Sequence, residues 1–132
     1  MNTMDADTTA TRAKTTADAR ESARRFLEAL QQPAVAAGAA ENVLLVVSEL
    51  VTNALRHGGG TYTLRLIAHP DLIEVAVDDP SPQVPHMRTP DLTGATGGFG
   101  WRIIDQLTRT TTVMHRPSGG KTVSAFLARW TP

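Results

Sequence analysis

Cysteine is absent from this chain of 132 residues, and so is any excess of charge of one sign. Without cysteine there is neither a disulfide framework nor a thiolate metal site, and thiol chemistry is excluded. Thirteen basic residues balance thirteen acidic ones. No stretch concentrates lysine and arginine as a nucleic-acid-binding surface would, so we expect no direct contact with nucleic acid.

Long hydrophobic segments are also missing. The longest uninterrupted apolar run in the centre of the sequence is Val43 to Val47, which is far too short to span a membrane. The polar start, MNTMDADTTATRAKTT, lacks the apolar segment of a signal peptide. These absences predict a soluble, cytoplasmic protein, and the chain length is typical of a single domain.

The N-terminal segment, residues 1–16, holds six threonines and almost no large apolar side chain. This composition indicates either a disordered arm or a frayed edge strand. We therefore expect one domain at 17–132 after this arm.

Helical and alternating periods succeed one another along the rest of the chain. Apolar residues at helical spacing predict an amphipathic helix at 17–30 and a second helix from about Ala39 to His57, which Gly58 to Gly60 would stop. The later elements are expected to be strands at 61–68 and 72–79, a loop at 80–100 rich in proline and glycine, a short helix at 101–107, and strands at 110–115 and 122–130. This order predicts an α+β two-layer sandwich, with helices on one face of a mostly antiparallel sheet.

Two polar residues, Glu49 and Asn53, interrupt the apolar pattern of the second expected helix. At about 100° per residue they form a stripe with Arg56, opposite the apolar face. The stripe could simply be the solvent face of an amphipathic helix. However, Leu45 and Val46 flank it, and apolar residues are not expected to border an ordinary solvated face. We therefore interpret the stripe as the lining of a half-enclosed pocket.

Asp79 is the second polar anomaly. It shares the parity of the apolar residues in its expected strand, so alternation directs its side chain toward the core, whereas Asp78 shares the outer face with Glu74. A buried carboxylate needs a partner, since leaving it unpaired costs on the order of several kcal/mol. A ligand donor could fill this role. Alternatively, Asp79 begins a turn with Pro80.

Two glycine clusters suggest phosphate binding but match no complete motif. GGKT at 119–122 is not a P-loop, because His115 stands where that motif needs a glycine. GFGWRI at 98–103 lacks the third glycine of a dinucleotide fingerprint and follows a loop instead of a strand. Glycines before a helix can nevertheless let the backbone approach an anion at the helix N-terminus. A flexible loop closing onto the helix would explain them equally well.

Four segments in fixed order resemble one known family. SELVTNALRHG, VAVDDPSP, GGFGWRIID and GGKTVSAFL resemble the N, G1, G2 and final threonine motifs of the Bergerat-fold (GHKL, HATPase) proteins. Within that group they are most similar to the small bacterial anti-sigma factor serine/threonine kinases of the actinobacterial type. The resemblance covers about residues 17–130.

The resemblance implies a role for each matching residue. Glu49 would be the catalytic general base, and Asn53 would ligate Mg²⁺ and thereby help to bind the nucleotide. Asp79 would accept a hydrogen bond from the adenine amino group. The remaining cofactor-binding matches are Arg56 and His57 at the phosphates, Thr122 behind the adenine, and Gly98, Phe99, Gly100 and Trp101, whose amides would hold the phosphates. For His57 the alternative is a cation favoured by the helix C-terminus.

The implied function is that of an ATP-binding and Mg²⁺-binding anti-sigma regulatory factor. It would phosphorylate a serine or threonine of a STAS-domain anti-sigma factor antagonist, bind a sigma factor, or both, with the loop at 82–97 acting as the ATP lid. Members of that family commonly dimerise, and an exposed apolar face of the first helix could support a homodimer here.

Two other functions stay open, and one departure from the family favours the first of them. The family has glycines after its aspartate, whereas here the sequence is Asp79-Pro80-Ser81-Pro82, and proline fixes φ and removes N–H donors. The chain could therefore be a nucleotide-binding regulator without transfer activity. It could also be an adaptor that binds no nucleotide.

Overall fold

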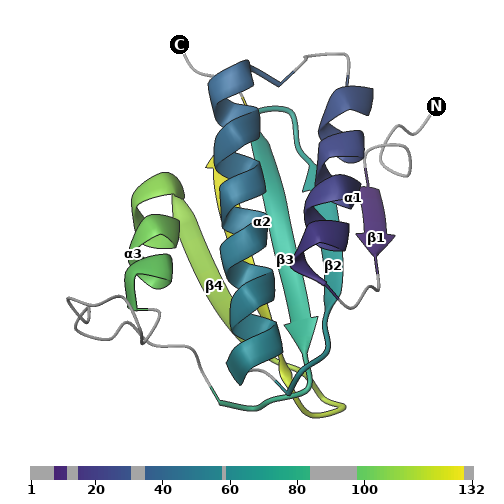
Figure 1. The fold of residues 1–132 in the computed structure, drawn as a ribbon, viewed down its shortest axis with the longest axis vertical. Coiled ribbons are helices and arrows are strands. Elements are labelled where there is room, and N and C mark those ends of the chain that lie inside the picture. Colours follow the sequence, from purple (N-terminus) through teal and green to yellow (C-terminus); the bar gives the residue numbers. More distant parts are fainter. Residues whose placement is uncertain (1–7, 12–14, 31–34, 58, 84–97, 130–132) are drawn as a thin grey trace.

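Three helices cover one face of an antiparallel sheet in the computed structural model, which describes residues 8–11, 15–30, 35–57, 59–83 and 98–129. The helices are α1 (Thr16–Ala29), α2 (Ala37–His57) and α3 (Gly98–Leu107). Figure 1 shows α2 lying between α1 and α3 across the middle of the sheet. The two-layer α+β architecture predicted from the sequence is confirmed.

The sheet has five strands in the order β1-β2-β3-β5-β4, and every neighbouring pair is antiparallel. Its strands are β1 (Thr8–Thr11), β2 (Thr63–Ala68), β3 (Leu72–Asp79), β4 (Thr110–His115) and β5 (Lys121–Ala128). The strand expected at 61–68 begins two residues later, at Thr63, and the one expected at 122–130 is shifted to 121–128. The hairpin turns, at 69–71 and 116–120, fall in the gaps between the expected strands.

The core lies between α2 and the helical side of the sheet. Alternation along the strands places one side chain in two on that face, in agreement with the sequence pattern. The strand residues buried there include Leu64, Leu66, Ile73, Val75, Val77, Val123, Ala125 and Leu127. They belong to the same buried cluster as Val43, Val47, Leu50, Val51 and Ala54 of α2.

Strand β1 decides between the two alternatives for part of the N-terminal arm. Its residues pair with β2 in the register Thr8↔Ile67 to Thr11↔Leu64. Residues 8–11 therefore form an edge strand, which places part of the segment 1–16 in the sheet. Residues 1–7 and 12–14 lie outside the described part.

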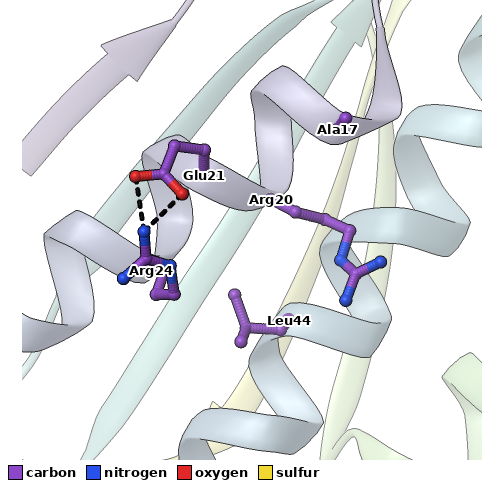
Figure 2. A pocket seen from close by; sticks show the side chains of 5 residues that line it. All are labelled: Ala17, Arg20, Glu21, Arg24 and Leu44. Atoms are coloured by element: carbon purple, nitrogen blue, oxygen red, sulfur yellow. Dashed lines mark hydrogen bonds and ion pairs between the residues drawn. The ribbon is translucent and has the colours of Figure 1, made fainter.

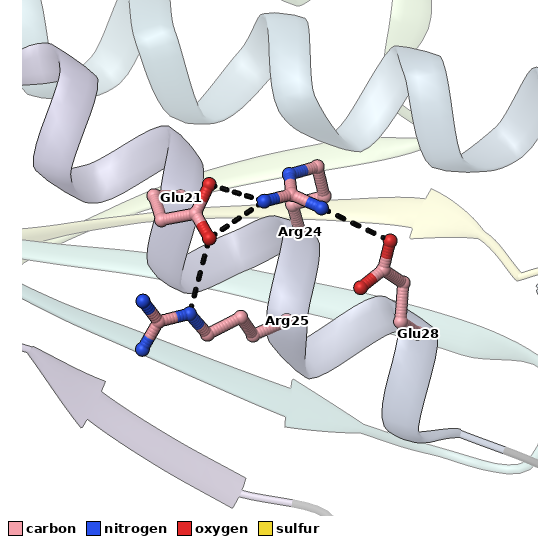
Figure 3. Close-up of polar contacts among 4 residues, drawn as sticks. All are labelled: Glu21, Arg24, Arg25 and Glu28. Carbon is pink, nitrogen blue, oxygen red and sulfur yellow. Dashed lines mark hydrogen bonds and ion pairs between the residues drawn. The ribbon is translucent and has the colours of Figure 1, made fainter.

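The outer face of α1 is charged, not apolar. Arg24 donates hydrogen bonds to Glu21 and Glu28, and Arg25 donates to Glu21 (Figure 3). The large apolar residues of this segment, Phe26, Leu27 and Leu30, are buried in the core. The expected exposed apolar face of the first helix is therefore wrong, because the apolar residues are used in packing against α2 and the sheet. The exposed apolar surface that could have supported a homodimer is therefore not present on α1.

No helix in the described ranges is both long enough and apolar enough to cross a membrane.

Candidate functional site

Three segments that are distant in sequence meet at Pro80. A Cβ atom added to Gly59, just after α2, would lie 2.5 Å from Pro80 Cγ. A Cβ added to Gly120, just before β5, would lie 2.2 Å from the backbone oxygen of Asp79 and 2.9 Å from Pro80 Cα. The C-terminal ends of α2 and β3 and the start of β5 therefore lie in contact, and they share one corner of the sandwich.

Gly120→Ala is expected to disrupt this corner. Gly119 and Gly120 both have positive φ, 92° and 78°, but only Gly120 has a backbone neighbour within 4 Å of the added Cβ. Gly119→Ala should cost about 1–2 kcal/mol through the left-handed conformation alone. Gly120→Ala should cost at least about 1 kcal/mol more, because the backbone of β3 must also move. Urea denaturation of both variants measures this difference, and equal losses would contradict the close approach.

The polar stripe of α2 is half-enclosed on one side. Glu49 and Asn53 are half-buried, and neither has a hydrogen-bond partner among the described residues. Val46, on one flank, is fully buried, whereas Leu45, on the other flank, is 41% exposed. The stripe is therefore closed on the Val46 side and open on the Leu45 side. Its two polar groups are available to something other than the described protein residues.

Asp79 lies on the core side of β3, as its parity predicts, and only 5% of its surface is exposed. Its Oδ1 atom accepts a hydrogen bond from the backbone N–H of Ser81 at 2.9 Å, so the turn interpretation of Asp79-Pro80 is confirmed. The same Oδ1 accepts from Nζ of Lys121 at 3.0 Å. The buried carboxylate thus has a protein cation as its partner.

Lys121 is the site residue that the sequence reasoning missed. It pairs with Asp79 across β3 and β5, and the side chains of both residues are only 4% exposed. Lys121 also shares the parity of Val123 and Ala125 in its strand, which face the core. That parity was the signal that could have identified Lys121 as a buried lysine.

Thr122 lies on the opposite face of the sheet from Asp79. It pairs with Asp78, and its hydroxyl donates to Asp78 Oδ1. The structure therefore does not bring Thr122 together with Asp79. The resemblance implied that Thr122 lies behind the adenine. In the structure, however, the residue beside Asp79 on the core face is Lys121.

The outer-face carboxylate of Asp78 is held by a bidentate ion pair. Arg65 donates to Oδ1 at 2.8 Å and to Oδ2 at 3.2 Å. Burial by itself raises the pKa of Asp78, but the hydrogen bonds from Arg65 and Thr122 outweigh burial and hold that pKa below its ordinary value of 3.8.

A pH dependence follows from this lowered pKa. Because the folded state lowers the pKa of Asp78, the ion pair stabilises the protein at neutral pH, and that contribution is lost as the pH falls from about 4 through the folded pKa. Arg65→Met should therefore cost roughly 1 kcal/mol at pH 7, since the Arg65 side chain is 41% exposed. The difference from wild type should shrink at pH 3. Urea denaturation at both pH values tests this, and a difference independent of pH would contradict it.

The other predicted phosphate contacts lie at two helix ends. Arg56 and His57 are exposed in the last turn of α2, where a helix favours cations. Gly98, Phe99, Gly100 and Trp101 form the first turn of α3. The two glycines therefore belong to the helix instead of preceding it, and the first N–H groups of such a turn lack intrahelical acceptors. The expected lid, 82–97, lies outside the described residues except for Pro82 and Gln83.

A separate groove of about 220 Å³ lies on the helical surface between α1 and α2 (Figure 2). It is lined by Ala17, Arg20, Glu21, Arg24 and Leu44. None of the residues predicted for the site lines this groove.

Comparison with known proteins identifies the family. The profile described as the histidine kinase-like ATPase domain matches residues 12–126, a range that includes α2, Asp79 and the first turn of α3. None of the curated proteins compared with the chain matches it. Members of the matching family typically bind ATP with Mg²⁺. The chain belongs to the histidine kinase-like ATPase domain family.

Proposed function

We propose that this chain binds ATP with Mg²⁺ at the corner around Pro80 and phosphorylates a serine or threonine of a STAS-domain anti-sigma factor antagonist. The observation that carries the proposal is the meeting of α2, β3 and β5 at Asp79 and Pro80. It places a nearly buried carboxylate beside the end of the helix whose Glu49 and Asn53 have no partner among the described residues.

The residues present fit the nucleotide and its metal. Asp79 uses only one carboxylate oxygen, Oδ1, for its described partners, so Oδ2 can accept a donor from a base. No group of three or more acidic or histidine side chains in the described ranges could hold a metal. This agrees with Mg²⁺ bound through one or two protein oxygens plus phosphates. The amide oxygen of Asn53 would be such a ligand, and Arg56, His57 and the amides of the first α3 turn would contact the phosphates.

Bound ATP supplies the phosphoryl group, and the protein supplies position and proton transfer. Glu49 would accept the proton of the partner's hydroxyl as that oxygen bonds to the γ-phosphorus and the bond to the β-phosphate oxygen breaks, leaving ADP. The guanidinium of Arg56 would offset the phosphate charge, and the exposed His57 beside it would contact the phosphates. Phosphoryl transfer requires little further covalent chemistry from the protein.

The choice of partner rests on the resemblance of the sequence motifs to anti-sigma factor kinases. In that setting the chain would also bind a sigma factor, which competes with the unphosphorylated antagonist. A second candidate, a nucleotide-binding regulator without transfer activity, is favoured by one specific observation. Asp79 is already paired with Lys121. It is followed by a turn at Pro80, whereas the family has glycines after its aspartate.

Titration calorimetry with ATP, with and without Mg²⁺, tests nucleotide binding. Wild type is expected to bind, and a hundredfold excess of MgATP over its Kd should stabilise the fold by about 2.7 kcal/mol. Asn53→Ala should lose the enhancement by Mg²⁺ and keep the weaker metal-free binding. Arg65→Met, altered on the opposite face of the sheet, should bind as wild type. Absence of heat and of any thermal shift with wild type would contradict the proposal.

A further inference from the structure

The ion pair between Asp79 and Lys121 leaves one hydrogen-bond acceptor and one donor unused. Both donors to Asp79, the N–H of Ser81 and Nζ of Lys121, go to Oδ1. Oδ2 has no partner in the part of the chain that the structure describes. The ammonium of Lys121 has three N–H groups, of which two are used, for Asp79 Oδ1 at 3.0 Å and the backbone oxygen of Ser81 at 3.2 Å.

One acceptor beside one donor is complementary to the Watson–Crick edge of adenine. That edge presents the 6-amino donor next to the N1 acceptor. Guanine presents one acceptor and two donors, so its 2-amino group would be left without a partner in a site of this kind. An unpaired buried polar group is costly, and the pair therefore favours adenine.

The charge of the pair also suits a neutral base. Both side chains are 4% exposed, and their opposite charges compensate each other before any ligand binds. A base can therefore approach without either charge being left alone in a buried place. Thr122 cannot contact the same base, because it lies on the opposite face of the sheet, where its hydroxyl donates to Asp78.

We propose that Lys121 is a base-recognition residue, whose ammonium donates a hydrogen bond to adenine N1 while Asp79 Oδ2 accepts one from the 6-amino group. This inference rests on the proposed ATP binding and adds a specificity determinant to it. Lys121 would keep its hydrogen bonds to Asp79 and Ser81, because it would donate the third hydrogen of its ammonium to adenine N1.

The test compares ATP with 1-deaza-ATP, in which a C–H replaces N1 and the 6-amino group is kept. Calorimetric titration of wild type with Mg²⁺ should show 1-deaza-ATP binding about tenfold to a hundredfold more weakly, since hydrogen bonds to charged groups have this strength. Lys121→Met should bind the two nucleotides within about twofold of each other, because the group that reads N1 is gone. If Lys121 had a purely structural role, Lys121→Met would weaken the binding of both nucleotides alike and leave the ratio of their affinities unchanged.

Arg65→Met is the matched control. It removes the ion pair between Arg65 and Asp78, on the opposite face of β3, and should keep the wild-type ratio between the affinities for the two nucleotides. Equal affinities of wild type for ATP and 1-deaza-ATP overturn the inference while leaving the proposed function intact, and this arm does not depend on folding of Lys121→Met. If neither nucleotide binds, the proposed function fails and the inference fails with it.

Discussion

Lys121→Met is expected to lower the free energy of unfolding by about 3–5 kcal/mol, the range found when one partner of a buried ion pair is removed. Methionine replaces the apolar stem of the side chain but has no ammonium, so the carboxylate of Asp79 is left without its cation. At 5% exposure that carboxylate has little access to water. Urea denaturation at pH 7 measures the loss.

Two further variants separate this charge effect from packing. Adding Asp79→Asn to Lys121→Met removes the uncompensated charge, so part of the stability should return. Arg65→Met, which breaks a pair that is far more exposed, should cost much less than Lys121→Met. A loss of less than about 1 kcal/mol for Lys121→Met would mean that the ion pair is not buried in solution.

Glu49→Gln is expected to reduce phosphoryl transfer by about a hundredfold to ten-thousandfold, the usual contribution of a general base. Glutamine has nearly the same shape but cannot accept the proton of the partner's hydroxyl. Binding of MgATP should change little, because the metal ligand in the proposal is Asn53. Transfer of labelled phosphate to the cognate STAS-domain protein measures the first quantity, and calorimetry measures the second.

Glu41→Gln provides the matched control, since Glu41 is an exposed carboxylate two turns earlier on α2. It should leave both transfer and binding unchanged. If Glu49→Gln transferred phosphate at the wild-type rate, Glu49 would not be the base. If wild type bound MgATP but transferred nothing, the regulator without transfer activity would be the better description.

Periodicity alone was enough to predict the layers of the fold and the polar anomalies. Alternation placed Asp79 on the core side and Asp78 on the outer side of β3, and helical spacing put Glu49 and Asn53 on one stripe of α2. These are local properties, because the direction of a side chain follows from its position within a single element. The structure bears out each of these placements.

Pairing between strands could not be predicted in the same way. Lys121 became visible as the partner of Asp79 only when the register of β3 and β5 was known. A shift of one residue in that register would have moved Thr122 to the core face, as the motif resemblance implied. The prediction that α1 exposes an apolar face was wrong for a related reason. The sequence shows that a helix is amphipathic, but it does not show which neighbours cover its apolar side.

A crystal structure of the protein with Mg²⁺ and a non-hydrolysable ATP analogue tests the central claim most directly. We expect the adenine amino group within hydrogen-bond distance of Asp79 Oδ2, N1 next to Nζ of Lys121, and the metal bound by the amide oxygen of Asn53. A nucleotide bound elsewhere, with Asp79 and Lys121 contacting only each other and Ser81, would contradict it.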